Sequence, residues 1–267
     1  YLLSGFNQSL VLTGALSQGT ARRVAETGKW WIDCTEPGGL SRFGEGFKTT
    51  LRVRLVHSLV RRNLSGREEW DAARWGLPLC QTDMAATYLG FSVVMLGGLR
   101  KLGVPVTGRE ARAVMHLWSY ACWVMGVDEP WLAFNERDGA VRLHHCLMTQ
   151  SRADWTSREL GAALAREPLA RHFKRFQGPR RWLLYRQHLS VSRYFLDREK
   201  MGQLGLPAGV TPWYPVLTLV PRLLGYSAQR WLPGLEAGQR RRGRDAQHRA
   251  LASMFGEGER AVTEPPL

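Results

Sequence analysis

Residues 44–64 read GEGFKTTLRVRLVHSLVRRNL, a turn punctuated by two glycines that runs into a helix. Thr49 or Thr50 can cap this helix, because a threonine oxygen accepts hydrogen bonds from the unpaired N–H groups of a first helical turn. The apolar residues recur with the helical period and predict one apolar face, made of Leu51, Leu55, Val56, Leu59 and Val60. The opposite side carries Arg52, Arg54, Arg61 and Arg62.

His57 does not belong to the charged side of the predicted helix. Its neighbours at i−4, i+3 and i+7 are Val53, Val60 and Leu64, so its side chain points along an apolar flank. A helical histidine among aliphatic residues and arginines suits a ligand that is apolar in the middle and anionic at its edge, and haem fits that description. A core histidine bonded to a main-chain carbonyl is the commoner arrangement, so both interpretations stay open on the pattern alone.

Composition predicts a folded, basic protein. The chain has 267 residues, 44% of them hydrophobic, and eleven tryptophans, which excludes a disordered chain. The net charge of +14 raises the alternative of a basic helical module that binds nucleic acid or an acidic membrane surface. The arginines are spread along the chain, however, and only residues 239–244, QRRRGR, form a dense run. We therefore expect no nucleic-acid partner, while peripheral membrane contact stays open.

The four cysteines, Cys34, Cys80, Cys122 and Cys146, are far apart and form no C-x-x-C motif. Zinc ribbons, thioredoxin-type redox motifs and covalent c-type haem attachment therefore lose support. The apolar surroundings of Cys122 and Cys146 predict buried free thiols. A reducing, cytoplasmic location is the default expectation, and the spacing of the cysteines leaves a disulfide open. Secretion is the alternative if a signal was removed upstream of Tyr1. The sequence contains no run of eighteen apolar residues, so no transmembrane helix is predicted.

Helical signals occur throughout the chain, and no alternating strand pattern of useful length does. We expect an all-α fold, a single globular helical domain over residues 1–267 with a frayed basic C-terminal tail from about residue 236. Residues 207–221 are rich in proline and are expected to form coil or a broken helix. The helices are expected at residues 4–15, 20–33, 49–64, 82–102, 107–125, 141–149, 157–166, 180–200 and 223–231.

Several stretches together resemble one protein family. They are Arg23-x-x-Glu26-Thr27, the Gly44-Glu45-Gly46 turn, residues 52–61 around His57, residues 82–87 (TDMAAT), and the helix with His116 and Trp118. The set resembles the latex clearing protein (rubber oxygenase) and mpaB-type oxygenase family, over residues 7–144. No single stretch is specific, but the spacing of the Arg23 motif and His57 matches the family.

The resemblance implies an all-helical, globin-reminiscent fold that holds a noncovalent haem b. By motif position, His57 is the proximal iron ligand, and Arg23 and Thr27 lie near the haem on its other side. Arg54 and Arg61 are candidates to pair with the haem propionates. Glu26, Arg23 and Thr27 are the candidate catalytic residues.

Two positions depart from the rubber-cleaving branch of the family. Glu26 stands where that branch has a lysine that can cap the iron, and a carboxylate cannot act as a neutral amine ligand. Asn7 stands near the place of a glutamate proposed as a base, and an amide cannot abstract a proton. Both departures weigh against rubber cleavage more than against haem binding.

The expected function is a haem b-dependent oxygenase that acts with dioxygen on an apolar, isoprenoid or alkene-like substrate, as a monomer or homodimer. The first alternative is a noncatalytic haem- or lipid-binding helical protein. A metal at His144 and His145 is disfavoured, because adjacent helical residues point about 100° apart. No G-x-S-x-G, H-E-x-x-H or P-loop motif occurs, which leaves hydrolase, zinc-protease and nucleotide-binding functions without support.

Overall fold

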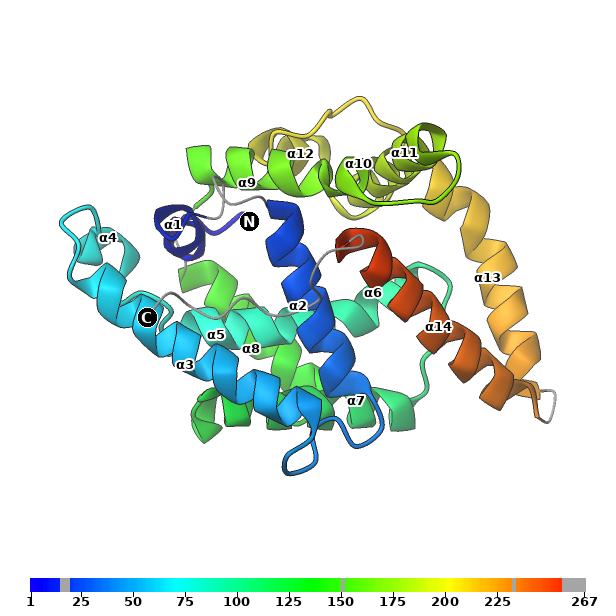
Figure 1. Ribbon diagram of the computed structural model, residues 1–267, viewed down its shortest axis with the longest axis horizontal. Helices are drawn as coiled ribbons and strands as arrows, with labels where there is room; N and C mark the ends of the chain where they lie inside the picture. The colour runs from blue at the N-terminus through cyan, green and yellow to red at the C-terminus, as the bar shows by residue number, and fades with distance from the viewer. Residues whose placement is uncertain (15–19, 150–151, 232–233, 256–267) are drawn as a thin grey trace.

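The apolar stretch predicted at residues 82–102 forms the helix at the centre of the molecule. It consists of α5 (Gln81–Leu89), a π-helical segment η1 (Gly90–Val94) and α6 (Met95–Lys101). The computed structural model describes residues 1–14, 20–149, 152–231 and 234–255, and every regular element in these ranges is a helix (Figure 1). The prediction of an all-helical fold is confirmed.

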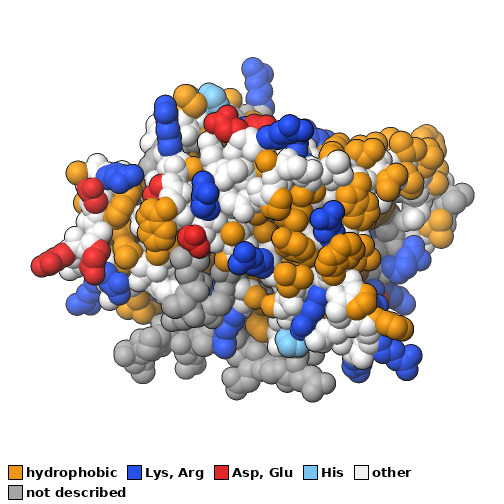
Figure 2. Space-filling model, turned by 90° about the horizontal axis from the view of Figure 1, so that it is seen from above, with side chains coloured by type: hydrophobic (Ala, Val, Ile, Leu, Met, Phe, Trp, Pro, Cys, Tyr) orange, Lys and Arg blue, Asp and Glu red, His pale blue; other side chains and the backbone are white. Residues whose placement is uncertain are grey.

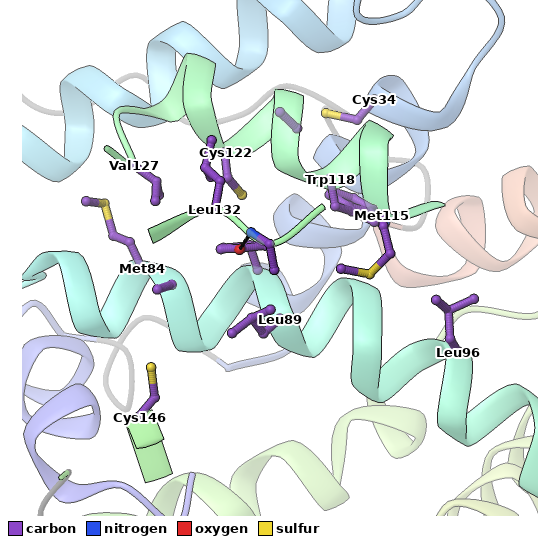
Figure 3. Packing of buried hydrophobic residues seen from close by; sticks show 14 of the residues in the cluster. Cys34, Met84, Leu89, Leu96, Met115, Trp118, Cys122, Val127, Leu132 and Cys146 are labelled. Carbon is purple, nitrogen blue, oxygen red and sulfur yellow. Dashed lines mark hydrogen bonds between the residues drawn. The ribbon is translucent and has the colours of Figure 1, made fainter. Parts of the chain in front are cut away.

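Within the described residues, Gln81–Lys101 is also the one helix long and apolar enough to span a membrane by length and composition, with a mean hydropathy of 1.2. Tyr88, Leu89 and Leu96 of this helix are fully buried inside the protein. Figure 3 shows Met84, Leu89 and Leu96 of the central helix in the same cluster as Met115, Trp118 and Cys122 of α7 (Gly108–Met125). The central helix is therefore the hydrophobic core.

Two further helices enclose the central helix. Helix α7 begins with a capping box, in which Thr107 accepts from the Glu110 N–H and Glu110 accepts from the Thr107 N–H. Helix α8 (Glu136–Thr149) crosses the π-helical segment at Gly139, where an added Cβ would lie 2.5 Å from Cγ2 of Val93. A side chain at this position would hold the two helices apart.

The helix α3 spans Glu45–Ser65, so the prediction that it begins at Thr49 or Thr50 is wrong. Its N-cap is Gly44, which offers no side-chain hydrogen bond, and both threonines are buried inside the helix. Part of the predicted apolar face is exposed, since Leu51, Leu55 and Leu59 are 42%, 59% and 45% accessible. The buried stripe is Gly46, Thr49, Thr50 and Leu64, with the partly buried Val53 and His57 between them.

Helices α9 to α12 form a smaller cluster above the helices of the first half of the chain (Figure 1). Its core residues are Ala165, Leu189, Met201 and Leu206. The helix predicted over residues 180–200 is divided at Leu196, because Asp197 caps a new helix by accepting from the Lys200 N–H. The helices here are α9 (Trp155–Ala165), α10 (Glu167–Ala170), α11 (Gln177–Phe195) and α12 (Arg198–Gln203).

The C-terminal region differs most from expectation. Helix α13 (Trp213–Trp231) continues through Pro221, so coil over residues 207–221 is wrong for most of that stretch. The frayed tail expected from about residue 236 is wrong as far as Phe255, because α14 (Leu235–Phe255) packs against α2 (Thr20–Thr35). Arg244 donates to the Thr35 carbonyl and His248 bonds Glu36, which shows why the basic stretch is helical. The remaining elements are α1 (Ser4–Leu12), α4 (Ala72–Trp75) and η2 (Glu129–Trp131).

Candidate functional site

Helices α2 and α3 run antiparallel and place Arg23 beside His57. Trp30 Nε1 donates to Thr50 Oγ1 at 2.9 Å, and Cys34 Sγ donates to the Gly46 carbonyl at 3.8 Å. In an antiparallel pair the residue numbers rise along one helix and fall along the other. The residue seven positions before Trp30 therefore lies level with the residue seven positions after Thr50. Arg23 and His57 therefore lie at the same height on facing helices.

His57 lies on the buried stripe of α3, as its aliphatic neighbours predicted. Its Nδ1 is buried and has no hydrogen-bond partner among the described residues. Among the described residues, Nδ1 therefore lacks the carbonyl partner expected in the alternative interpretation of this histidine. Burial, and then the positive charges of Arg61 and Arg23, lower the pKa of His57 to about 4. The imidazole is neutral at physiological pH, which is the form that binds metal ions.

His57 lines a pocket of about 280 Å³ between α3, the loop before α5 and the end of α7. The volume is near the lower end of small-molecule sites, which run from about 300 Å³ upward. Opposite α3 the pocket is lined by Leu77, Cys80, Met84 and Met125, with the polar Gln81 among them. Burial raises the pKa of the Cys80 thiol, so this wall is uncharged at neutral pH.

Two predicted cofactor-binding residues, Arg54 and Arg61, form the other side of the pocket. Arg54 Nη1 donates to the Val124 carbonyl at 3.1 Å. Arg61 donates through Nε to the Pro78 carbonyl at 3.2 Å and through Nη2 to that of Leu79 at 2.7 Å. The two guanidinium groups thus brace the pocket walls, and a guanidinium has five N–H donors, enough to bind an anion as well.

The predicted catalytic residues lie on α2. Thr27 Oγ1 donates to the Arg23 carbonyl at 3.0 Å, and Glu26 Oε1 accepts from Arg22 Nε at 3.3 Å. Arg23 and Thr27 are exposed, and the side chain of Glu26 is 14% accessible. The structure brings Arg54, His57 and Arg61 together with Arg23 nearby, while Glu26 and Thr27 are not among the described residues that line the pocket.

Asn7 and the remaining histidines have structural or surface positions. Asn7 is fully buried and donates to the Tyr1 carbonyl and to Ser157 Oγ, which ties α1 to α9. His116, His144 and His145 are exposed, and no group of three or more possible metal ligands occurs in the described ranges.

Sequence reasoning missed Cys80, Met84 and Met125 as pocket residues. The i, i+4 spacing of Cys80 and Met84 at the start of α5 was the available signal, since it places both on one side of a helix. Met125 gave no such signal, because its position depends on how the end of α7 meets α3. The buried thiols predicted at Cys122 and Cys146 are confirmed.

Comparison with known proteins identifies the family of the chain. Residues 2–254 match the family described as ER-bound oxygenase mpaB/B′/Rubber oxygenase, catalytic domain. The chain is 24% identical over 112 residues to a rubber oxygenase of Streptomyces sp. (strain K30), a match that covers 41% of this chain and only 28% of that relative. No solved structure matches the chain. Because the family match extends over nearly the whole sequence, the chain belongs to the mpaB/rubber oxygenase catalytic-domain family.

Proposed function

We propose that this protein is a haem b-dependent oxygenase that uses dioxygen to oxidise an apolar, isoprenoid or alkene-like substrate, with His57 as the proximal iron ligand. The observation that carries the proposal is the neutral His57 imidazole with a buried, unpaired Nδ1 at an arginine-lined pocket. Family membership supports the oxygenase activity.

The residues around His57 fit a haem ligand. A buried polar atom without a partner costs about 1–3 kcal/mol, so the His57 ring favours a ligand or partner that would engage it. Arg54 and Arg61 are positive and held in place at the pocket edge, which suits propionate groups. Cys80, Met84 and Met125 suit the apolar macrocycle.

Haem, when bound, supplies the iron on which dioxygen is activated. The protein then contributes position and polarity. His57 holds the group from α3, and Arg54 and Arg61 hold its edge. Arg23, level with His57 on α2, and Thr27 lie outside the described pocket lining and would donate hydrogen bonds to dioxygen. Glu26, one helical turn after Arg23, would supply or accept the proton that the reaction needs.

The substrate class follows from the uncharged wall of the pocket. Leu77, Met84 and Met125 offer no charged group to orient a polar substrate, whereas an isoprenoid chain needs only apolar contact. Glu26 in place of lysine separates the proposed reaction from rubber cleavage. The protein is proposed to act in a reducing, cytoplasmic setting, consistent with four free cysteines.

Haem content tests the proposal directly. We expect the purified protein to show a Soret band and a pyridine haemochrome, and His57→Ala to lower its haem content about tenfold or more. The matched control is His116→Ala, which removes an exposed helical histidine and leaves haem content unchanged. Equal haem in wild type and His57→Ala would exclude His57 as the ligand.

Oxygen consumption separates the enzyme from a noncatalytic haem-binding protein. With squalene as the isoprenoid probe, we expect dioxygen uptake that falls about a hundredfold in Glu26→Gln, the size of a typical general acid–base contribution. Haem binding without dioxygen uptake would favour the noncatalytic alternative. Full activity in Glu26→Gln would remove Glu26 from the mechanism.

A further inference from the structure

Helix α13 presents an apolar stripe to solvent. Leu217, Val220, Leu224 and Trp231 follow one another at helical spacing and are 67%, 56%, 65% and 85% accessible. Val216 and Leu223 widen the same stripe and are also exposed. Figure 2 shows hydrophobic side chains gathered at this end of the molecule. Isolated exposed apolar residues are normal, but a continuous stripe of this length marks an interaction surface.

The inner side of α13 already has its partners. Tyr214 N donates to Ser190 Oγ of α11, and Pro215 is buried. The Leu219 carbonyl lies so close to Gly103 that a Cβ there would come within 2.5 Å of it. The helix is therefore anchored on one face, and its apolar stripe points away from the body of the protein.

The charges near the stripe are positive. From residue 201 to residue 231 the sequence contains no Asp or Glu, and its two charged residues are Arg222 and Arg230. Arg222 donates to the Tyr214 hydroxyl and Arg230 to Glu110, so both lie on the anchored side. Helix α14, which packs against α13, carries the exposed Arg240, Arg241 and Arg242 in its second turn.

Arg241 and Arg242 have charges available for a ligand. Arg240 pairs with Glu236 at 2.5 Å, whereas neither Arg241 nor Arg242 has an acidic partner in the described part of the chain. Arg241 lies six residues into α14, about 9 Å along the helix from Leu235. Because α14 packs against α13, both arginines lie on the helix that adjoins the apolar stripe.

We propose that this α13–α14 surface, formed by Leu217, Val220, Leu224 and Trp231 with Arg241 and Arg242, docks on a phospholipid bilayer that contains anionic lipids. The leucines, valine and tryptophan enter the interface between head groups and acyl chains, and the arginines bind lipid phosphates. The proposal goes beyond the oxygenase function and depends on neither haem nor activity.

Charge favours a bilayer over a second copy of the chain. A twofold dimer through α13 would place the same patch of both subunits face to face. Arg241 and Arg242 of each copy would then adjoin an α13 helix that carries no acidic residue to pair with them. An anionic lipid surface neutralises these charges instead.

Vesicle cosedimentation of the full chain tests the proposal. We expect binding to phosphatidylcholine vesicles containing phosphatidylglycerol about tenfold or more tighter than to phosphatidylcholine alone, weakened by added salt. Leu217→Gln/Val220→Gln/Leu224→Gln should weaken binding to the anionic vesicles about tenfold or more. Arg241→Gln/Arg242→Gln, on an exposed surface where folding is not at risk, should abolish most of the preference for anionic lipid.

The control changes three exposed leucines on another helix. Leu51→Gln/Leu55→Gln/Leu59→Gln on α3 should bind vesicles as the wild type does, and circular dichroism checks that every variant is folded. The proposal is overturned if the wild-type protein does not bind anionic vesicles. It is also overturned if the α3 variant loses as much vesicle binding as the α13 variant. A dimer in light scattering that the α13 changes dissociate, without vesicle binding, would assign the stripe to a second copy and also overturn it.

Discussion

Gly46 sets how closely α2 and α3 approach, and with it the distance between Arg23 and His57. A Cβ at this position would lie 2.6 Å from the Asp33 carbonyl oxygen and 2.7 Å from Cys34 Cα. Carbon atoms in contact lie about 3.5–4.0 Å apart, so Gly46→Ala must move the helices apart by about 1 Å. Both obstructing atoms are main chain, which excludes relief by a side-chain rotation.

The expected cost of Gly46→Ala follows from this geometry. Added volume in a packed contact typically costs about 1–3 kcal/mol, and the change also strains the Thr50 Oγ1 bond to the Gly46 carbonyl at 2.6 Å. For a protein of this size, 1 kcal/mol lowers the melting temperature by about 2–4 °C. We therefore expect a melting temperature roughly 2–12 °C below wild type in thermal unfolding followed by circular dichroism.

The control is the same substitution on the facing helix. Gly28 lies inside α2, and a Cβ there would lie 3.8 Å from Leu251 Cδ1, an ordinary contact. Gly28→Ala should stabilise the protein by about 0.5–1 kcal/mol, because alanine loses less conformational freedom in a helix. The reasoning is refuted if Gly46→Ala melts at or above the wild-type temperature, or if both alanines shift the melting temperature equally.

Three further results are expected. The pKa of His57 is lowered to about 4 in the folded protein and is about 6.5 in the unfolded chain, so the unfolded state binds a proton first as the pH falls. In urea titrations, the unfolding free energy of haem-free wild type should therefore fall by about 2 kcal/mol more between pH 7 and pH 5 than that of His57→Gln. Equal losses in the two proteins would contradict the low pKa. Thr50→Val leaves Trp30 Nε1 without its acceptor and should lower the unfolding free energy by about 1–3 kcal/mol, whereas a neutral change would show that the bond is not needed. With a thiol reagent at pH 8, the pocket residue Cys80 should react before the other three cysteines, and all four should react in denaturant. If Cys80→Ser leaves the kinetics of thiol modification unchanged, this order of reaction is disproved.

Local sequence predicted the elements whose signals are local. The Thr107 and Glu110 capping box fixed the start of α7, because both partners of the two hydrogen bonds lie within four residues. The start of α3 was misplaced for the converse reason. Gly44 is the N-cap of α3 and has no side chain to form a cap bond. Thr50 Oγ1 instead accepts a hydrogen bond from Trp30 of another helix, a contact that a local sequence pattern cannot reveal.

The C-terminal errors have a similar cause. Pro221 and the arginines near residue 241 suggested broken and frayed chain, as their intrinsic preferences do. Tertiary contacts override those preferences here. Arg244 and His248 bind Thr35 and Glu36 at the end of α2, more than two hundred residues earlier in sequence.

The exposed stripe of α3 shows what helical periodicity can and cannot specify. The period correctly groups Leu51, Leu55 and Leu59 on one face, but it does not say which face meets a neighbouring helix. The size of the side chains determines which face of α3 packs against α2. The two helices approach so closely at Gly46 that only small residues such as Thr49 and Thr50 fit the contact near it. The same contact turns His57 inward. The aliphatic neighbours of His57 therefore identified it as a candidate ligand from the sequence alone. Its alignment with Arg23 depends instead on Gly46, which lies eleven residues away and has no functional side chain.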